Sequence, residues 1–282
     1  MILVFGDTGQ VARELARLAP EARYLGRKEA DLTDPRACAA AITAHRPRAV
    51  INAAAYTAVD RAEEEEALAT VINGDAPAAM ARACAASGVP FVHISTDYVF
   101  DGAGDAPFTP DHLTAPLGAY GRSKLKGEEG VRAAGGIYAI LRTSWVVSAH
   151  GVNFVKTILR LGVEREALRV VADQIGGPTS ARAIAAACLR MAEGLAQDPT
   201  KTGLYHLSGQ PATSWAGFAR AIIAEAGMEC AIEDIPSEDY PTPARRPLYS
   251  RLDCRGLAAF GFNPPDWRAE LKDIVSELEG RP

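Results

Sequence analysis

The first half of the chain alternates short apolar runs with longer alanine-rich segments. The apolar runs predict strands over residues 2–5, 23–25, 49–53, 91–95 and 138–143. The segments between them predict helices over residues 10–18, 67–87 and 120–132. Strands rich in Val and Ile that alternate with helices are typical of a parallel sheet with both faces covered. The pattern therefore predicts an α/β fold built on a doubly wound parallel sheet.

The second half of the chain has a looser pattern. Helices are predicted over residues 153–161, 181–196 and 215–226. Frequent prolines between residues 236 and 247 exclude long regular structure there. Residues 203–209 (GLYHLSG) predict a strand that returns to the main sheet. We therefore expect a main domain over residues 1–148 and a smaller lobe over residues 149–282, interleaved around residues 203–209.

Composition and charge narrow the class of protein. The 282 residues are 48% hydrophobic and 23% charged, as in ordinary globular proteins. Thirty basic and thirty-five acidic residues give a net charge of −5, with no basic cluster that would bind nucleic acid. No apolar stretch approaches the ~20 residues of a membrane span, and no basic leader precedes the first strand. We expect a cytoplasmic protein without a nucleic-acid or membrane partner.

The five cysteines show no metal or disulfide pattern. They are Cys38, Cys84, Cys188, Cys230 and Cys254. They form no CxxC pair, and no histidine stands near them at ligand spacing. The sequence therefore predicts small reduced side chains and no metal site at these positions.

A glycine-rich turn follows the first predicted strand. Gly6, Gly9 and Ala12 form GxxGxxA at the point where the strand passes into a helix. Gly6 permits the tight turn, Gly9 lets the backbone approach a pyrophosphate, and Ala12 lets the helix pack closely on the sheet. The helix amino end then faces the negative phosphates. This context predicts a dinucleotide-binding site, and so a dinucleotide-binding function for the main domain.

The end of the second predicted strand bears on the choice of cofactor. An acidic residue there accepts the ribose 2′-hydroxyl of NAD, whereas a cation suits the 2′-phosphate of NADP. Gly26, Arg27 and Lys28 follow the strand directly, and Asp31 comes shortly after. The cations favour NADPH, and Asp31 leaves NADH open.

A tyrosine and a lysine stand at i and i+4 at the start of a predicted helix. Tyr120 and Lys124 therefore share one face, where an ammonium favours the phenolate and lowers the tyrosine pKa. Thr96 ends the strand FVHIS at the edge where doubly wound sheets bind ligands, within reach of the same carbonyl oxygen. The three side chains predict proton delivery to a carbonyl that receives hydride.

Motifs along nearly the whole chain carry a family resemblance. They are FGDTGQV, VINAAAYTAVDRAE, STDYVFDG, YGRSKLKGE, LRTSWV, NFVKTILRL, DQIGGPT and PTPARRPLYSRLD. On these the chain resembles the extended short-chain dehydrogenase/reductases, and within them the dTDP-4-dehydrorhamnose reductases. The resemblance implies a Rossmann-type sheet and a C-terminal substrate-binding lobe. It also implies NADPH-dependent reduction of the C4 carbonyl of dTDP-4-dehydro-6-deoxy-L-mannose to dTDP-L-rhamnose for cell-surface polysaccharide.

The same resemblance implies roles for individual residues. It makes Tyr120 the proton donor, Lys124 its partner and a ligand of the cofactor ribose, and Thr96 the third catalytic member. The cofactor would be lined by Gly6, Gly9, Gln10, Val11, Arg27, Asp31, Leu32, Ala55, Tyr56, Thr57, Asn73, Tyr120 and Lys124. The sugar-nucleotide substrate would be contacted by Val59, Thr96, Asp97, Trp145, Asn153, Phe154 and Arg246. An arginine such as Arg246 grips a diphosphate with its planar fork, and Trp145 offers a flat apolar face to a deoxysugar.

Several questions stay open at the level of sequence. The resemblance implies a homodimer, and in some relatives acidic residues at the subunit interface, here Glu63 to Glu66, hold Mg²⁺. Ala12 replaces the third glycine of the family pattern, which affects cofactor affinity more than cofactor identity. A sugar-nucleotide epimerase or dehydratase is an alternative on the same scaffold. A non-catalytic regulatory subunit, of the type that partners methionine adenosyltransferase, is another, although intact Thr96, Tyr120 and Lys124 argue against it.

Overall fold

Six parallel strands form the central sheet. The computed structural model describes residues 1–280. The strands lie in the order β2, β1, β3, β4, β5, β10, and each neighbouring pair is parallel. Their bounds are β1 Ile2–Phe5, β2 Arg23–Leu25, β3 Ala49–Asn52, β4 Phe91–Thr96, β5 Tyr138–Thr143 and β10 Gly203–Leu207. The order reverses between β1 and β3, the switch point where such sheets open a crevice for ligands.

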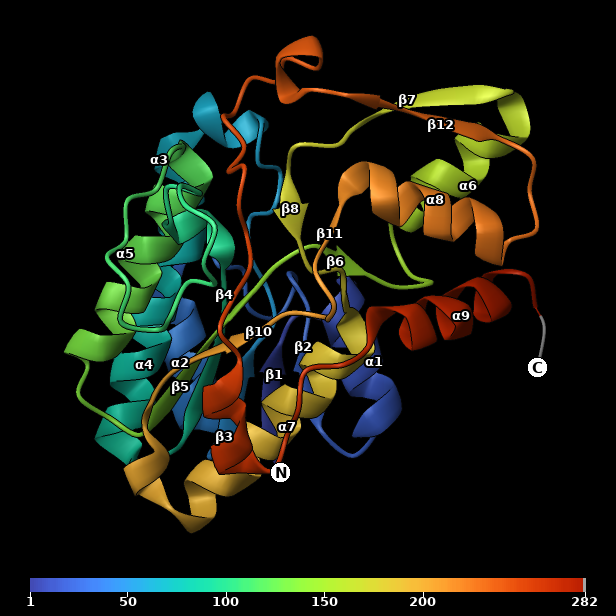
Figure 1. Cartoon of the computed structure of the whole chain (residues 1–282). Coiled ribbons are helices and arrows are strands. Elements are labelled where there is room, and N and C mark those ends of the chain that lie inside the picture. Colours follow the sequence, from blue (N-terminus) through green and yellow to red (C-terminus); the bar gives the residue numbers. More distant parts are fainter. Residues whose placement is uncertain (281–282) are drawn as a thin grey trace.

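Helices cover both faces of this sheet, and β1 shows how the sequence directs them. Ile2 and Val4 enter one apolar core, whereas Leu3 and Phe5 enter the core on the opposite face. Side chains alternate along a strand, so an unbroken apolar run supplies both cores. The helices on the first face are α1 (Gln10–Leu18) and α7 (Ala181–Gln197), and those on the second are α2 (Pro35–His45), α4 (Ala76–Ser87) and α5 (Ala119–Ala133), as Figure 1 shows.

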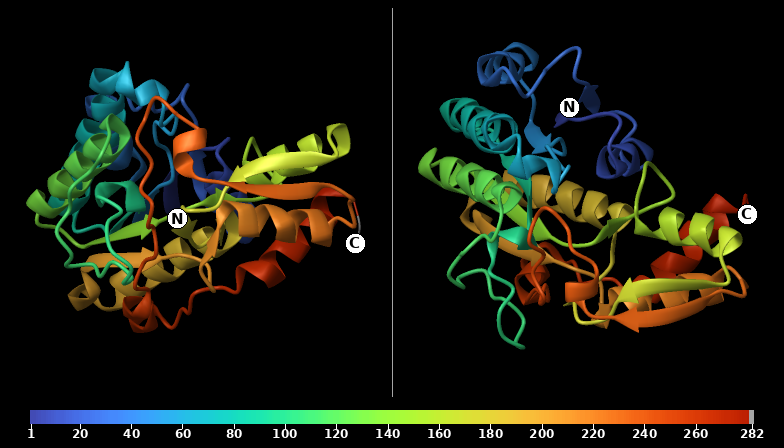
Figure 2. Two further views of the ribbon diagram at one scale, coloured as in Figure 1. Left: turned by 45° about the horizontal axis from the view of Figure 1, so that its top comes forward. Right: turned by 90° about the horizontal axis from the view of Figure 1, so that it is seen from above.

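A smaller lobe has its own apolar core. Its elements are α6 (Phe154–Glu164), α8 (Trp215–Glu225), α9 (Trp267–Leu278) and the parallel pair β7 (Ala167–Val171) and β12 (Ala231–Ile235). Ile158, Leu168, Phe218 and Leu271 from these elements lie in one buried cluster. Both views of Figure 2 show the lobe at the end of the molecule away from α4 and α5.

Two short strand pairs lie where the chain passes between sheet and lobe. They are β6 (Val146–Val147) with β9 (Thr179–Ser180), and β8 (Ile175–Gly176) with β11 (Thr213–Ser214). The chain leaves the sheet after β5 and returns to it for α7 and β10. It then leaves again for α8. The strand predicted over residues 203–209 is confirmed, because β10 pairs with β5 at the edge of the sheet.

The single helix predicted over residues 67–87 is wrong in one respect. The segment forms α3 (Glu66–Thr70), a π-helical turn (Val71–Asp75) and then α4. Pro77 lies in the first turn of α4 and has no amide hydrogen for the carbonyl of Asn73, so the regular α-helical pattern is interrupted there. Helices α2 and α9 were not among the predicted elements.

The cysteines lie inside the protein. All five are buried and free, and burial raises the pKa of Cys84 and Cys188 to about 12. Among the helices of residues 1–280, none has both the length and the hydrophobicity that crossing a membrane requires.

Candidate active site

The turn after β1 leaves the amino end of α1 open. Gly6 has a φ of +108°, which residues with a side chain rarely adopt, so it makes the tight turn. Gly9 is the N-cap of α1 and offers no side chain to its first amides. Side-chain oxygens cap α2, α6, α7, α8 and α9. Uncapped amides and the helix dipole attract an anion, so this turn fits a dinucleotide diphosphate.

The loop after β3 lies directly beside this turn. A Cβ on Gly6 would touch Ala53 at 3.4 Å. Asn73 Oδ1 accepts a hydrogen bond from Tyr56 N (2.8 Å), and its Nδ2 donates to Tyr56 O (3.0 Å) and Ser123 Oγ (3.0 Å). Asn73 is buried, and its side chain bonds to other residues of the protein. It therefore holds the shape of the predicted cofactor loop. The other predicted loop residues, Ala55 and Thr57, are exposed.

Two of the charged residues that follow β2, Arg27 and Asp31, pair with each other. Arg27 Nε lies 3.2 Å from Asp31 Oδ2 in an exposed ion pair. The pKa of Asp31 is lowered, first by the backbone hydrogen bond from Thr33 and to a smaller extent by Arg27. Leu32, which the family pattern assigns to the cofactor site, is buried in the core beneath.

Asp7 is a residue here that sequence reasoning missed. It lies in the glycine-rich turn and is exposed. A Cβ on Gly26 would overlap the Asp7 carboxylate, so the glycine at this position lets the Asp7 side chain pack against the end of β2. A second carboxylate thus lies at the end of β2, where the adenosine end of a dinucleotide is expected. The available signal was a glycine directly after the second strand.

The three predicted catalytic side chains come from β4 and α5. Thr96 ends β4, and Tyr120 and Lys124 lie one turn apart at the start of α5. Thr96 and Lys124 are buried, whereas Tyr120 is half-buried. The Tyr98 ring packs edge-on against Tyr120, with centroids 5.5 Å apart. A strand of the sheet and a helix that packs on it therefore supply these three groups.

Burial dominates the acidity of Tyr120. It raises the pKa of Tyr120 to about 12, while a hydrogen bond with Thr96 lowers it and the charge of Asp97 raises it. Lys124 Nζ donates to Ile94 O at 2.6 Å and does not offset this effect. The prediction that the lysine lowers the tyrosine pKa is therefore wrong for this structure. The phenol stays protonated at neutral pH, which is the form a proton donor needs.

Two charged residues predicted to contact substrate lie near this phenol. Burial raises the pKa of Asp97 to about 6, although hydrogen bonds with Ser250 and Thr96 lower it. Arg246 Nη2 pairs with Asp60 Oδ2 at 2.8 Å. Its Nη1 is buried and has no hydrogen-bond partner in the described part of the chain. One edge of the guanidinium therefore keeps the capacity to bind a ligand oxygen.

Trp145 adopts a left-handed backbone conformation after β5, with φ of +50°. A bulky residue rarely takes this conformation, and surrounding packing must hold it. Trp215 stacks on its indole at 3.6 Å between centroids, and a Cβ on Gly176 would overlap the indole. Phe154 packs on Trp215 in turn, at 4.6 Å. The flat face predicted for a deoxysugar is thus covered on one side by Trp215, which sequence reasoning missed.

Gln10 joins the first helix to the smaller lobe. Its Oε1 accepts hydrogen bonds from Ser148 Oγ (2.8 Å) and Asn153 Nδ2 (3.0 Å). Asn153 also caps α6 by accepting from Lys156 N. A predicted cofactor residue is therefore bonded directly to a predicted substrate residue. Val11 and Val59 are half-buried.

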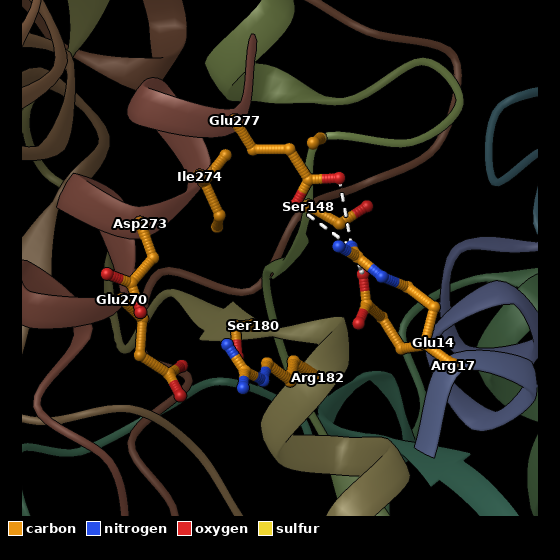
Figure 3. A pocket seen from close by; sticks show the side chains of 10 residues that line it. Glu14, Arg17, Ser148, Ser180, Arg182, Glu270, Asp273, Ile274 and Glu277 are labelled. Atoms are coloured by element: carbon orange, nitrogen blue, oxygen red, sulfur yellow. Dashed lines mark hydrogen bonds and ion pairs between the residues drawn. The ribbon is translucent and has the colours of Figure 1, made fainter. Parts of the chain in front are cut away.

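A small polar pocket of about 40 Å³ lies between α1, α7 and α9. Arg17 Nη1 and Glu277 Oε1 pair across it at 2.9 Å, and Glu14 and Arg182 also line it (Figure 3). Its lining residues in the described chain include none of the predicted catalytic side chains. Acidic and basic groups are paired or mixed there, and the pocket is separate from the sheet edge that holds Tyr120.

The acidic run Glu63 to Glu66 makes bonds within the chain. Glu63 Oε1 accepts from Ala119 N at the start of α5 (2.8 Å), and Glu66 pairs with Arg122 (2.7 Å). Within residues 1–280, no group of three or more His, Cys, Asp or Glu side chains is placed to hold a metal ion. The Mg²⁺ implied by the resemblance gains no support from this chain.

A buried ion pair joins β5 to α5 beside the predicted catalytic residues. Arg142 pairs with Glu128 through Nε–Oε1 (2.8 Å) and Nη2–Oε2 (2.6 Å), and Ser95 Oγ donates to Oε1 (2.6 Å). His206 Nε2 lies 3.4 Å from Arg142 Nη1. Burial, reinforced by the Arg142 charge, lowers the pKa of His206 to about 3, so the imidazole is neutral and fits a structural role.

Fold and site together define a class. A doubly wound parallel sheet, an open glycine turn at its switch point and a Thr-Tyr-Lys set at its carboxyl edge are the features of a dinucleotide-dependent reductase of the extended short-chain dehydrogenase type.

Comparison with known proteins identifies the family within that class. The profile described as "RmlD substrate binding domain" matches residues 1–279. A dTDP-4-dehydrorhamnose reductase of Burkholderia thailandensis is 45% identical over 294 residues, covering 98% of each chain. The chain belongs to the dTDP-4-dehydrorhamnose reductase family, whose members are NAD(P)-dependent oxidoreductases.

Solved structures agree with this assignment. The reductase of Clostridium acetobutylicum superposes with a TM-score of 0.92 at 35% identity, covering 99% of each chain. The reductase of Bacillus anthracis in complex with NADP superposes with a TM-score of 0.90 at 36% identity, covering 98% of each chain. The predicted fold class is confirmed.

Proposed function

We propose that the protein uses NADPH to reduce the C4 carbonyl of dTDP-4-dehydro-6-deoxy-L-mannose to dTDP-L-rhamnose. The observation that carries the proposal is the meeting of Thr96, Tyr120 and Lys124 at the carboxyl edge of the sheet, beside the open turn of α1. The names of the relatives support the substrate, and the NADP complex of the Bacillus anthracis reductase supports the cofactor.

The chain's own residues then provide binding and proton transfer. NADPH, when bound, supplies the hydride to the carbonyl carbon. Tyr120 donates its phenolic proton to the carbonyl oxygen, which becomes the product hydroxyl, and is left as phenolate. The Thr96 hydroxyl, which donates to Asp97 Oδ1 in this structure, would turn its hydrogen to the same oxygen and hold it in place. Lys124 donates a hydrogen bond to the cofactor ribose.

Remaining predicted residues bind the two molecules. Arg246 Nη1 is free to bind a diphosphate oxygen of the sugar nucleotide. Asp97 is placed beside Thr96 to accept from a sugar hydroxyl. The other proposed substrate contacts are Val59, Trp145, Asn153 and Phe154. The proposed cofactor cradle is Gly6, Gly9, Gln10, Val11, Arg27, Asp31, Ala55, Tyr56 and Thr57. Leu32 and Asn73 are buried behind it and would hold it in shape by packing and by hydrogen bonds to Tyr56.

A direct assay tests this proposal. Purified protein is mixed with NADPH and the dehydrorhamnose nucleotide, and loss of NADPH absorbance is followed together with chromatography of the nucleotide sugar. We expect stoichiometric conversion to dTDP-L-rhamnose. Binding of NADPH without turnover would instead support the regulatory-subunit alternative. A product that forms without net NADPH oxidation would support an epimerase or dehydratase.

Cofactor preference is expected to depend on the Arg27–Asp31 pair. Asp31→Ala frees the guanidinium for the 2′-phosphate of NADPH, and we expect the NADPH-to-NADH ratio of kcat/KM to rise roughly tenfold, about 1.4 kcal/mol. Arg27→Ala is expected to lower that ratio by a similar factor. Steady-state kinetics with both cofactors measures it. Unchanged ratios in both variants would show that the pair does not set the preference.

A further inference from the structure

A buried histidine faces the proposed catalytic lysine and has no role in the function described above. His93 lies in β4 with no exposed surface. Its Nε2 lies 3.4 Å from Lys124 Nζ, and its Nδ1 lies 3.2 Å from Asn52 Nδ2. Gly127 lies beside the ring and lets α5 pack closely on the preceding segment, because a Cβ there would overlap Asn73 O.

The backbone of the cofactor loop fixes how Asn52 meets this ring. Asn52 Oδ1 accepts a hydrogen bond from Ala54 N at 3.2 Å. Turning the amide over would set its NH₂ group against that backbone N–H, so Nδ2 must face His93. Since Nδ2 only donates, His93 Nδ1 must accept. A neutral imidazole that accepts at Nδ1 carries its proton on Nε2.

That tautomer points an N–H at the lysine. An ammonium has three donors and no lone pair, so one of its hydrogens would meet the His93 N–H. An uncharged amine avoids the conflict: one hydrogen goes to Ile94 O (2.6 Å), the lone pair accepts from His93, and one hydrogen remains for the site. Protonation of the histidine would not relieve the conflict, because an imidazolium carries a hydrogen on both ring nitrogens. Burial, reinforced by the Lys124 charge, also holds the pKa of His93 well below its usual value, so the ring stays neutral.

We propose that His93, locked in one tautomer by Asn52, is a positioning residue that favours the uncharged amine of Lys124 over the ammonium. Burial acts in the same direction and lowers the pKa of Lys124 to about 8. Glu128, one turn further along α5, opposes this with its charge, and Arg142 on β5 pairs with that carboxylate. Tyr120 stands on the preceding turn of α5. The two charge states of the lysine therefore lie close in free energy near neutral pH.

The titration of Lys124 tests this inference without relying on catalysis. Protein labelled with ¹³C at lysine Cε is titrated by NMR, and the Lys124 resonance is assigned by its loss in Lys124→Met. His93→Gln retains a side chain of similar reach but can turn its oxygen to the lysine. We expect its Lys124 midpoint to rise by roughly one pH unit. His206→Gln, at another buried histidine that faces Arg142, is the matched control and is expected to leave the midpoint unchanged.

A second variant tests the tautomer of His93 in a protein that keeps the histidine. In Asn52→Asp the carboxylate can still accept from Ala54 N, but it has no hydrogen to donate to His93. It therefore favours the tautomer with the hydrogen on Nδ1, which leaves Nε2 as an acceptor for the ammonium. Its midpoint is also expected to rise. The new carboxylate could also raise the midpoint directly through its charge, and that effect would persist without the histidine. If the effect passes through His93, the rise caused by Asn52→Asp should largely disappear in a His93→Gln background. Unchanged midpoints in both single variants, or fully additive shifts, would overturn the proposal.

The kinetic consequence rests on the proposed function. If Lys124 acts as an ammonium, the alkaline limb of kcat/KM follows its midpoint and moves upward in His93→Gln. A shift in the NMR midpoint without any reductase activity would leave the inference about His93 intact while removing the proposed function.

Discussion

Tyr120→Phe is expected to lower kcat by roughly 10²–10⁴-fold, the usual contribution of a positioned general acid. The phenol is held at the sheet edge by Thr96 and by the Tyr98 ring, and its raised pKa keeps the proton in place at neutral pH. Phenylalanine retains the ring and its packing but has no proton to give. Cofactor affinity, measured by titrating the fluorescence of NADPH, is expected to stay within about threefold, since only one hydroxyl is lost.

Tyr98→Phe is the matched control for this change. It removes a hydroxyl group too, but from the neighbouring Tyr98 ring, which packs edge-on against Tyr120 with centroids 5.5 Å apart. We expect less than about a tenfold loss of kcat, because no proton transfer is assigned to this residue. If Tyr120→Phe kept more than a tenth of wild-type kcat, or if both variants lost activity equally, Tyr120 would not be the proton donor.

The sheet was predictable because its signals are local. Strands β1, β3, β4 and β5 each contain a short apolar run, and alternation along β1 supplies both cores. The two missed helices also carry local signals. Asp34 caps α2 and is followed by Pro35 in the first turn, and Asp266 caps α9. These caps were visible in the sequence and could have found both helices.

Some residues of the candidate site also follow from local sequence signals, whereas others do not. Spacing on one helix places Tyr120 with Lys124, and the end of a parallel strand places Thr96. In contrast, Trp215 covers Trp145 from another part of the chain. Such contacts depend on how the smaller lobe packs against the sheet, which no local pattern reports.

Charges show a further limit of sequence reasoning. Arg246 was predicted as a free diphosphate ligand, yet Asp60, 186 residues away, occupies one of its edges. The lysine was expected to acidify Tyr120, yet burial raises the pKa of that tyrosine instead. Desolvation depends on the completed fold, so the direction of a pKa shift does not follow from spacing alone.

Removing the arginine from the buried ion pair is expected to cause a large loss of stability. Arg142→Met leaves the Glu128 carboxylate buried without its bidentate partner, and such a change typically costs about 3–5 kcal/mol of unfolding free energy. Both side chains are almost completely buried, with relative exposures of 2% and 0%. Urea unfolding followed by circular dichroism measures the loss. Arg160→Met, in the exposed pair with Glu164, is the control and is expected to change the free energy by less than about 0.5 kcal/mol.

The double variant Arg142→Met/Glu128→Leu distinguishes an unpaired charge from lost packing. Without the carboxylate no charge is left buried, so we expect most of the lost stability to return, because apolar residues of similar volume often replace such pairs at little cost. Ser95 then loses its acceptor, which limits the recovery by about 1 kcal/mol. A double variant as unstable as Arg142→Met would show that the guanidinium packing, including its place over the Phe100 ring, matters more than charge compensation.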